Sequence, residues 1–471
     1  MKSNYSPRGP LGCKVAFLSA SPQSFIACTG ATSCRPRSRT PAHGLLQRPR
    51  RTTPLNMRSS TLPISFADRV LPLKNEGAYA MMKAAARLDA SATREHERVV
   101  HLEIGQPTIS PPPHVVRALS EALERGETKY VHPKGTLALR ETIARYVERT
   151  HSLPAGSVLP ENVIVGPGAK PGLVLGCLAL LNPGDEVLIP DPGFPTYRAM
   201  VELCGAIPVP YPLLPDTNAP DVAFIGKRIS NRTKLIVINS PGNPTGGIFG
   251  SEDTQSLKRI LAGAAGRIWL MTDEIYSRLH YLSSTSNLAA AVPSSVFDDP
   301  EVRDRVILVD GLSKTFAMTG FRVGYAVVPS SLAERMEVLA VHSFGCVAPF
   351  VQHAAVTALT DSVENDAYLA QAMALYRTNR DVVLAMAADI PGCRLWRPDG
   401  AFYAWLDVSA HRQSAQLIVC ELLERARVAV LPGTDFGAGG EGFLRVSYAG
   451  DTASVREGMR RIQRFFAEKA G

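Results

Sequence analysis

Short apolar runs, each leading into a polar or glycine-rich segment, recur through the middle of this 471-residue chain. Five of them occupy residues 163–165, 186–189, 235–238, 268–271 and 306–309. Stretches with helical patterning separate them, which is the alternation typical of a parallel α/β sheet. Ligands of such sheets bind outside the carboxyl ends of the strands. We therefore expect the segments that follow these runs to meet in one site.

The pattern changes from about residue 343 to long helical stretches with a few strands, including residues 401–406 and 442–448. This mixture is typical of a smaller α+β domain. The predicted division is an N-terminal segment joining the small domain at 67–108, a large domain at 109–342 and a small domain at 343–471.

Residues 1–66 differ from the rest in composition, being rich in Ser, Arg and Pro. Of the chain's 51 Lys and Arg, ten lie in the first 67 residues, where there is no Asp or Glu. The remainder carries 41 basic and 43 acidic residues, which argues against a nucleic-acid-binding surface on the folded part. We interpret this disordered tail either as a transit peptide for a mitochondrial or plastid matrix, or as an over-long reading frame. In the second case Met57 is the true start and the protein is cytoplasmic.

Hydropathy and cysteine spacing exclude other classes. No apolar run approaches the ~20 residues that a membrane-spanning helix needs, so no membrane association is expected. None of the eight Cys forms a Cys-x-x-Cys pair, so zinc and redox motifs are absent and no metal site is predicted.

Lys314 is the central candidate for chemistry. It lies in Gly-Leu-Ser-Lys-Thr-Phe-Ala-Met-Thr-Gly-Phe-Arg-Val-Gly-Tyr (residues 311–325), just past the run at 306–309. A lysine at a strand end in a cleft poor in water loses its charge easily, and it can form a Schiff base with an aldehyde. Arg322 could pair with a phosphate, and the backbone amides of residues 168–170 at a predicted helix start favour the same anion.

Four further residues could hold a pyridine-like ring. Asp273 would place a carboxylate opposite a ring nitrogen. At ~4 Å and an effective dielectric of ~20 such a pair interacts by roughly 4 kcal/mol, which keeps a pyridine protonated near neutral pH. Tyr276 and Asn243 could hydrogen-bond a phenolic oxygen, and Phe194 could stack on the ring. Taken singly, each has a structural alternative, such as a turn cap for Asp273 or a salt bridge for Arg322.

Three segments, taken together, favour the functional interpretation. They are Ser-Pro-Gly-Asn-Pro-Thr-Gly at 240–246, Asp-Glu-Ile-Tyr at 273–276 and the lysine segment at 313–325. In this order and spacing, the chain from about residue 70 to its C-terminus resembles the class I/II aminotransferases of the aspartate aminotransferase type. The resemblance implies pyridoxal 5′-phosphate as cofactor on the fold-type I scaffold. That α/β fold has a large domain, with a mostly parallel seven-stranded sheet sandwiched by helices, and a smaller α+β domain.

The resemblance also implies roles for individual residues. Lys314 would hold the cofactor as a Schiff base and shuttle the proton. The implied cofactor contacts are Gly168, Ala169, Lys170 and Arg322 at the phosphate, Phe194, Asn243, Asp273 and Tyr276 at the ring, and Tyr130 at the phosphate of a neighbouring subunit. The implied substrate contacts are Gly105, Asn243 and Arg445, of which Arg445 grips the α-carboxylate. The role of Tyr130 implies a homodimer with a shared active site.

The chain departs from the family pattern at three places. Gly311 stands where many members carry a Ser that touches the phosphate, and Gly242 stands where an Asn often precedes the ligand Asn. Gln-Pro-Thr at 106–108 replaces the commoner Glu-Pro-Asp. None of these changes removes a group that the chemistry requires.

The implied function is a ping-pong transfer of an amino group between an L-amino acid and a 2-oxo acid. A β-eliminating lyase or a cyclase on the same scaffold is the enzymatic alternative, because fold does not fix the reaction. A transcription regulator with an aminotransferase-like domain would need a DNA-binding helical module ahead of the fold, and the Pro-rich tail offers none. The donor amino acid cannot be identified from the sequence, since the α-carboxylate arginine serves all substrates.

Overall fold

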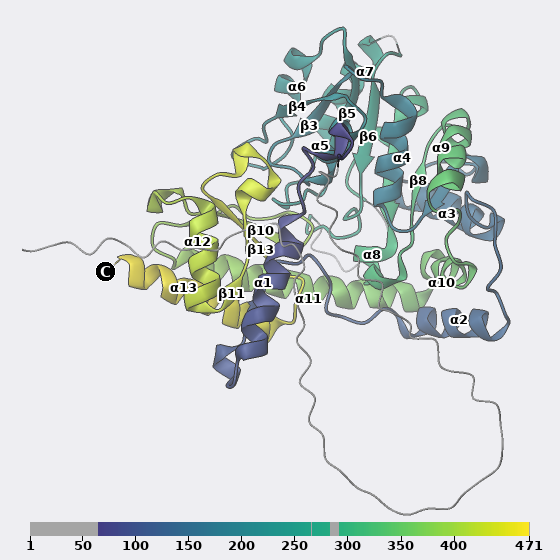
Figure 1. The fold of residues 1–471 in the computed structure, drawn as a ribbon. Helices are drawn as coiled ribbons and strands as arrows, with labels where there is room; N and C mark the ends of the chain where they lie inside the picture. Colours follow the sequence, from purple (N-terminus) through teal and green to yellow (C-terminus); the bar gives the residue numbers. More distant parts are fainter. Residues whose placement is uncertain (1–64, 265, 283–291, 471) are drawn as a thin grey trace, which may run out of the picture. The chain divides into compact units, whose positions relative to one another are not determined.

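The computed structural model describes residues 65–264, 266–282 and 292–470 (Figure 1). The predicted tail falls almost wholly outside these ranges, so both interpretations of it remain predictions. Residue contacts separate Met1–Phe66 from Ala67–Gly471, and the second of these units carries the fold described below.

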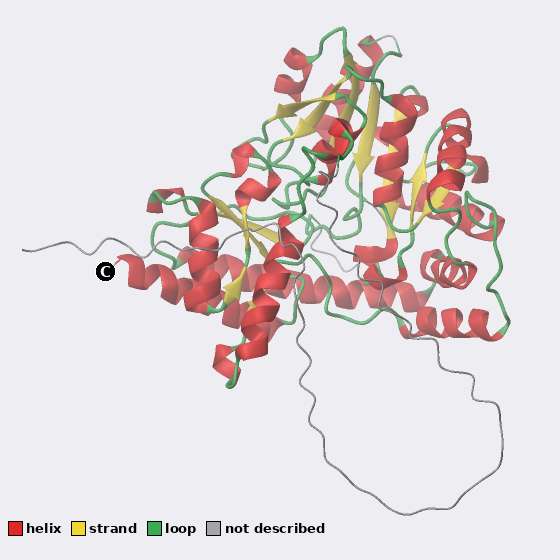
Figure 2. Cartoon of the chain, in the orientation of Figure 1, coloured by secondary structure: helices red, strands yellow, loops and turns green. Residues whose placement is uncertain are grey.

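A seven-stranded sheet organises the larger part of this unit (Figure 2). In spatial order its strands are β2 (Val163–Gly166), β8 (Gly324–Val327), β7 (Val306–Gly311), β6 (Trp269–Asp273), β5 (Thr233–Asn239), β3 (Glu186–Pro190) and β4 (Ile207–Tyr211). All neighbouring pairs are parallel except those of β8, which runs antiparallel to both β2 and β7. The predicted mostly parallel seven-stranded sheet is confirmed, and each of the five apolar runs overlaps one of its strands.

Helices cover both faces of this sheet (Figures 1 and 2). They are α4 (Lys170–Leu180), α5 (Thr196–Leu203) and α9 (Ser330–Ser343) on one face, and α3 (Leu137–Thr150) and α7 (Ser251–Gly263) on the other. Successive side chains of a strand point to opposite faces. Leu235 and Val237 of β5 therefore pack with the first group, whereas Ile236 and Ile238 pack with the second. Burial on both faces explains why the central strands are almost continuously apolar.

Smaller sheets form the second part of the unit. A four-stranded antiparallel sheet contains, in order, β12 (Leu431–Pro432), β13 (Phe443–Ser447), β10 (Tyr403–Asp407) and β9 (Arg394–Leu395), and β1 (Val100–His101) pairs in parallel with β11 (Val428–Ala429). Residues of α1 (Gly77–Ser91), α11 (Val363–Ala388), α12 (Ala415–Glu421) and α13 (Thr452–Ala470) pack in the same core as these strands. This is the predicted α+β part. Because β1 pairs with β11, the N-terminal segment joins the small sheets, as expected for the segment 67–108. The domain boundaries themselves stay predictions.

The remaining helices complete the larger part. They are α2 (Pro113–Glu124), α6 (Val222–Arg228), α8 (Leu312–Thr315) and α10 (Pro349–Leu359), of which α2 and α10 pack against each other. The long helix α11 joins the two parts, because Leu369 lies in a core of the large sheet and Tyr376 in the core of the small one. Across the described residues, none of the helices is both long and apolar enough to span a membrane.

Candidate functional site

The carboxyl ends of β5, β6 and β7 bring three of the predicted site segments together. Asp273, the last residue of β6, lies in register with Asn239 at the end of β5. The Asn239 amide donates to the Asp273 carbonyl (2.8 Å), and its side-chain oxygen accepts from the backbone N–H of Asn243 (2.7 Å). Lys314 follows β7 in the short helix α8. The strand ends thus converge as the sequence predicts, with Asn239 holding the turn that carries Asn243.

Asp273 is a fully enclosed carboxyl group. The Tyr197 hydroxyl donates to its Oδ2 (2.7 Å), and the Ile275 N–H donates to its Oδ1 (3.3 Å). Burial raises the pKa of Asp273 from 3.8 to about 6, against the opposing effect of these hydrogen bonds and of Lys314. A buried carboxylate of this kind is stabilised by a cationic partner, such as a protonated ring nitrogen.

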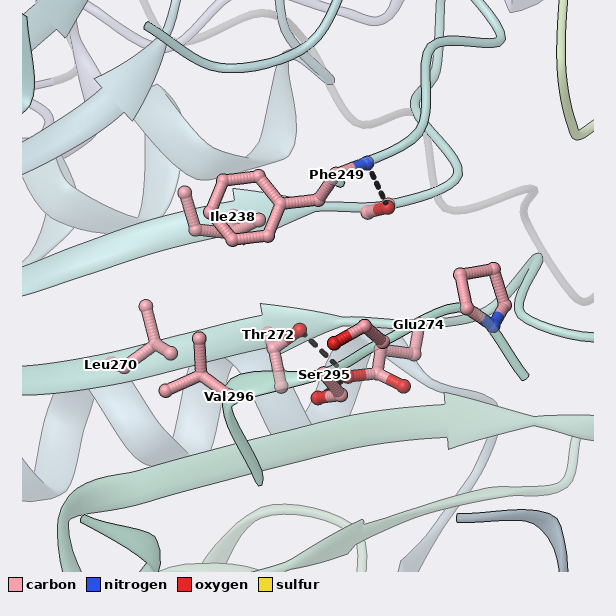
Figure 3. Close-up of a pocket in the computed structure, with 10 residues that line it drawn as sticks. Ile238, Phe249, Leu270, Thr272, Glu274, Ser295 and Val296 are labelled. Carbon is pink, nitrogen blue, oxygen red and sulfur yellow. Dashed lines mark hydrogen bonds between the residues drawn. The ribbon is translucent and has the colours of Figure 1, made fainter. Parts of the chain in front are cut away.

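Glu274, the next residue, lies with its carboxylate between Thr272 and Ser295 (Figure 3). Its Oε1 accepts hydrogen bonds from the hydroxyls of Thr272 (2.9 Å) and Ser295 (2.6 Å), and its Oε2 lies 3.5 Å from Nε2 of His151. The cavity beside it, of about 10 Å³, is too small for a ligand larger than water. Of two adjacent carboxylates, only Asp273 therefore faces the site.

Lys314 donates its ammonium proton to the carbonyl oxygen of Gly105 (2.7 Å). Burial lowers the pKa of Lys314 to about 8. The positive charges nearby act in the same direction, Arg445 most strongly, and Asp273 opposes them. A fraction of this lysine is therefore a neutral amine near physiological pH, which is the form that attacks carbonyl compounds.

Arg445, in β13, lies opposite the strand ends. Its Nη1 donates to Oδ1 of Asn243 (3.0 Å), and its Nη2 donates to the Glu103 carbonyl. The guanidinium lies over the rings of Tyr403 (4.5 Å) and Phe436 (4.9 Å). Its Nε is buried without a hydrogen-bond partner among the described residues. A fixed, incompletely satisfied guanidinium of this kind suits a carboxylate ligand.

Gly168, Ala169 and Lys170 stand where α4 begins, as predicted, and Arg322 approaches them. Arg322 donates to the carbonyls of Thr319 and Pro167 (both 3.0 Å), and its guanidinium would overlap a side chain at Gly168, where φ is +94°. A Cβ at Gly324 would lie 2.5 Å from the Gly168 carbonyl carbon and 2.6 Å from the Ala169 nitrogen. Glycine at 324 therefore lets β8 pass directly beneath this turn.

The Lys170 side chain has a different environment from the one expected for a phosphate ligand. Its ammonium forms an ion pair with Glu76 and lies 5.1 Å from the centre of the Phe194 ring. Lys170 can therefore contribute its backbone N–H to an anion at the start of α4, while its side chain is already engaged. Phe194 itself is half-buried and packs edge-on against Tyr197.

Tyr276 and Tyr403 form a buried pair, with their hydroxyl oxygens 2.7 Å apart. The Tyr403 hydroxyl also lies so close to Gly105 that any side chain there would overlap it. Tyr403 thus contacts Tyr276, Gly105 and Arg445 at once.

Tyr130 is the one predicted cofactor residue that the structure leaves apart from the others. It lies between α2 and α3, and its side chain is 97% exposed. It makes no contribution to the site of its own chain.

A cavity of about 650 Å³ adjoins these residues. Its lining includes Phe194, Asp191, Gly77, Asp435 and Phe436. Phe436 lies beneath the Arg445 guanidinium. The cavity therefore extends from the predicted ring-stacking residue to an aromatic ring that contacts the predicted carboxylate-binding arginine, although Arg445 is not part of its lining. Within the described ranges, no three His, Cys, Asp or Glu residues cluster as metal ligands.

Sequence reasoning missed four residues of this cluster: Tyr197, Asn239, Tyr403 and Glu76. Asn239 directly precedes the Ser-Pro-Gly-Asn segment, and Tyr197 follows Phe194 by three residues, so their positions gave a weak signal. Glu76 and Tyr403 reach the site only through contacts between segments far apart in the chain, which periodicity cannot show.

Comparison with known proteins gives concordant results. Residues 97–462 match the family model for aminotransferase class I and II. An aspartate aminotransferase of Pyrococcus horikoshii is 34% identical, over 85% of this chain and 96% of that protein. An arginine–pyruvate transaminase of Pseudomonas aeruginosa is 33% identical, over 86% of this chain and 99% of that protein. The structure of an aspartate aminotransferase from Thermus thermophilus with maleate superposes with a TM-score of 0.78 at 33% identity, covering 85% of this chain and all of that one.

The burial of Asp273 predicts a pH-dependent stability. Asp273→Asn removes the charge but keeps an oxygen that can accept from Tyr197. Because the folded pKa is raised, the unfolded chain releases its proton first, so the wild type loses stability relative to the variant as pH rises. With a pKa of 3.8 rising to about 6, the difference should change by about 2 kcal/mol between about pH 4 and pH 7. Urea unfolding of the cofactor-free proteins measures it.

The matched control for this experiment is Asp216→Asn, at an exposed loop position. Its difference from the wild type should not vary with pH. A pH-independent difference for Asp273→Asn as well would show that Asp273 is not desolvated as the structure indicates.

Proposed function

Because the chain belongs to the class I and II aminotransferases, and is thus a pyridoxal-phosphate-dependent transaminase, we propose that the cluster around Lys314, Asp273 and Arg445 is its active site. The reaction transfers an amino group between an amino acid and a 2-oxo acid. The observation that carries the proposal is that a lysine of lowered pKa and a buried carboxylate at the edge of the large sheet face an arginine of the small sheet with a buried Nε that has no hydrogen-bond partner among the described residues.

The residues present fit the cofactor. In this proposal Lys314 is its covalent attachment point and Asp273 partners the ring nitrogen, which supplies the cation that the buried carboxylate lacks. Asn243 and Tyr276 bind the ring oxygen, and Phe194 covers one ring face. Pyridoxal phosphate, when bound, supplies an aldehyde for the lysine and a ring that withdraws electrons from the substrate.

The phosphate is assigned to the turn before α4. The backbone N–H groups of Ala169 and Lys170 stand at the start of α4, where the dipole favours an anion, and Arg322 adds a guanidinium. The Gly168 N–H already donates to the Gly166 carbonyl (2.7 Å). Gly311 offers no hydroxyl to this group, so the amides and Arg322 hold more of its charge than in relatives with Ser there.

Lys314 is also assigned the proton transfer. An amine with a pKa of about 8 is close enough to the working pH to take a proton from the substrate α-carbon and return it. The Gly105 carbonyl accepts from Nζ and fixes its position in the proposed site. Burial of this amine keeps water away from the reacting carbon.

Arg445 is assigned the substrate α-carboxylate. Asn243 and the Glu103 carbonyl fix its guanidinium, so little side-chain entropy is lost when a carboxylate binds. Fixing the carboxylate here places the amino group of the substrate on the side of Lys314.

The proposal includes a homodimer. The 97% exposure of Tyr130 in a single chain supports its assignment to the phosphate site of a second copy. Substrate exchange would then occur at two sites, each completed by Tyr130 of the partner subunit. The cellular location depends on residues 1–66, as an organellar matrix or the cytoplasm, and the N-terminus of the mature protein distinguishes the two.

Lys314→Ala tests the assignment of the lysine. The wild type should show a visible absorption band of bound cofactor that amino donors abolish, and the variant should lack the covalent band. Its transamination rate should fall by roughly 10²- to 10⁴-fold, because proton transfer is lost. Lys258→Ala, which removes a lysine paired with Asp299, is the matched control and should behave as wild type. Full activity of Lys314→Ala would contradict the assignment.

Gly324→Ala tests the phosphate turn. The added Cβ would displace the backbone of residues 168–169, so the dissociation constant of the cofactor should rise by about tenfold or more. Gly320→Ala, in the same segment, meets no atom within 4 Å and should leave the constant unchanged. Equal affinities for both variants would place the phosphate elsewhere. Equilibrium titration of the cofactor-free proteins gives the constants.

A further inference from the structure

The segment before α1 brings an acid to the edge of the proposed active site. Glu76 occupies the N-cap position of α1 without a side-chain capping hydrogen bond, and its carboxylate forms an ion pair with the ammonium of Lys170. The Thr196 hydroxyl donates to the same carboxylate oxygen (3.3 Å). Since Lys170 lies over the Phe194 ring, Glu76 neutralises the cation next to the ring-stacking residue.

A second acid lies nearby. Asp435 is half-buried, and neither of its carboxylate oxygens has a hydrogen-bond or ion-pair partner among the described residues. The backbone of Gly77 lies so close that a Cβ there would overlap this carboxylate, so Asp435 packs against the residue that directly follows Glu76. Burial raises the pKa of Asp435 to about 6, and Arg445 opposes the shift.

Both acids lie where a substrate side chain must go. Once the α-carboxylate occupies Arg445 and the amino group faces Lys314, the space that remains is the cavity between Phe194 and Phe436. Asp435, Phe194 and Gly77 line this cavity. Glu76 directly precedes Gly77, and its ion-pair partner Lys170 lies over the Phe194 ring. Farther out, Arg198 pairs with Glu202 (3.6 Å), Asp191 accepts from the Gly439 N–H (2.8 Å), and Lys74 is exposed at the rim.

We propose that Glu76 is a specificity-determining residue of this transaminase. It lowers the affinity for dicarboxylic substrates and so favours amino acids with neutral or cationic side chains. The inference rests on the proposed function and deepens it. A side-chain carboxylate would meet Asp435 and Glu76 as like charges and would find Lys170 occupied. An amide or an amine of similar size can donate hydrogen bonds to the same oxygens.

The test compares isosteric donors on the holoenzyme. Values of kcat/KM are measured for aspartate against asparagine and for glutamate against glutamine. The wild type should favour each amide by about tenfold or more, the range expected when a buried charge meets like charge. Glu76→Gln frees Lys170 without changing shape, so the acid-to-amide ratio should rise by about tenfold, mainly through a lower KM for the acids.

Two further variants separate specificity from structure. Glu334→Gln removes an exposed acid of α9 that is not part of the cavity lining, and it should leave the ratio within about twofold of wild type. In the double variant Glu76→Gln/Lys170→Met, the rise in the acid-to-amide ratio of kcat/KM should disappear. A purely structural ion pair would instead lower the stability of Glu76→Gln and leave the ratio unchanged, which would overturn the inference. A wild type that prefers aspartate to asparagine would overturn it as well.

A binding measurement distinguishes failure of this inference from failure of the proposed function. Titration of the visible cofactor band with maleate should give a dissociation constant about tenfold lower for Glu76→Gln than for wild type. If the band is present and responds to amino acids, but maleate binds both proteins equally, only the role of Glu76 is wrong. If no band can be reconstituted in the wild type, the active-site assignment itself fails, and this inference falls with it.

Discussion

The burial of one carboxylate, Asp273 at the end of β6, is the constraint on which the rest of the site depends. Ionised Asp273 is costly in the folded protein, and Tyr197 and the Ile275 N–H offset only part of that cost. A cationic ring opposite it would remove the penalty. Cofactor binding and stability are therefore coupled, because any group that neutralises Asp273 in the folded state also stabilises the fold.

The same water-poor environment accounts for the lowered pKa of the Lys314 amine. Burial that raises the pKa of Asp273 lowers that of Lys314, so one sheet edge holds an acid and a base that are both displaced toward neutral pH. Opposed pKa shifts of neighbouring groups are frequent at active sites, where burial and charge are arranged to bring acids and bases toward neutral pH. Glycines at 105 and 324 make the site possible, since each lets another segment approach where a side chain would overlap it.

The sequence allowed much of this architecture to be predicted. The five apolar runs are strands, and their parallel order brings the segments containing Asn243, Asp273 and Lys314 to one edge. Strand patterns did not show that β8 runs antiparallel, because burial is the same in either direction. They also did not reveal Tyr403 or Glu76, whose positions depend on packing between distant segments. For Lys170 the residue was identified, but its side chain pairs with Glu76, a contact that no local pattern encodes.

The central claim is that the cofactor is attached to Lys314, and one measurement tests it directly. The purified holoenzyme is reduced with borohydride, which fixes an imine between cofactor and lysine, and its proteolytic peptides are analysed by mass spectrometry. The account predicts the phosphopyridoxyl group on the peptide containing Ser-Lys-Thr-Phe, at Lys314. Modification at Lys170 or another lysine, with Lys314 unmodified, would contradict it.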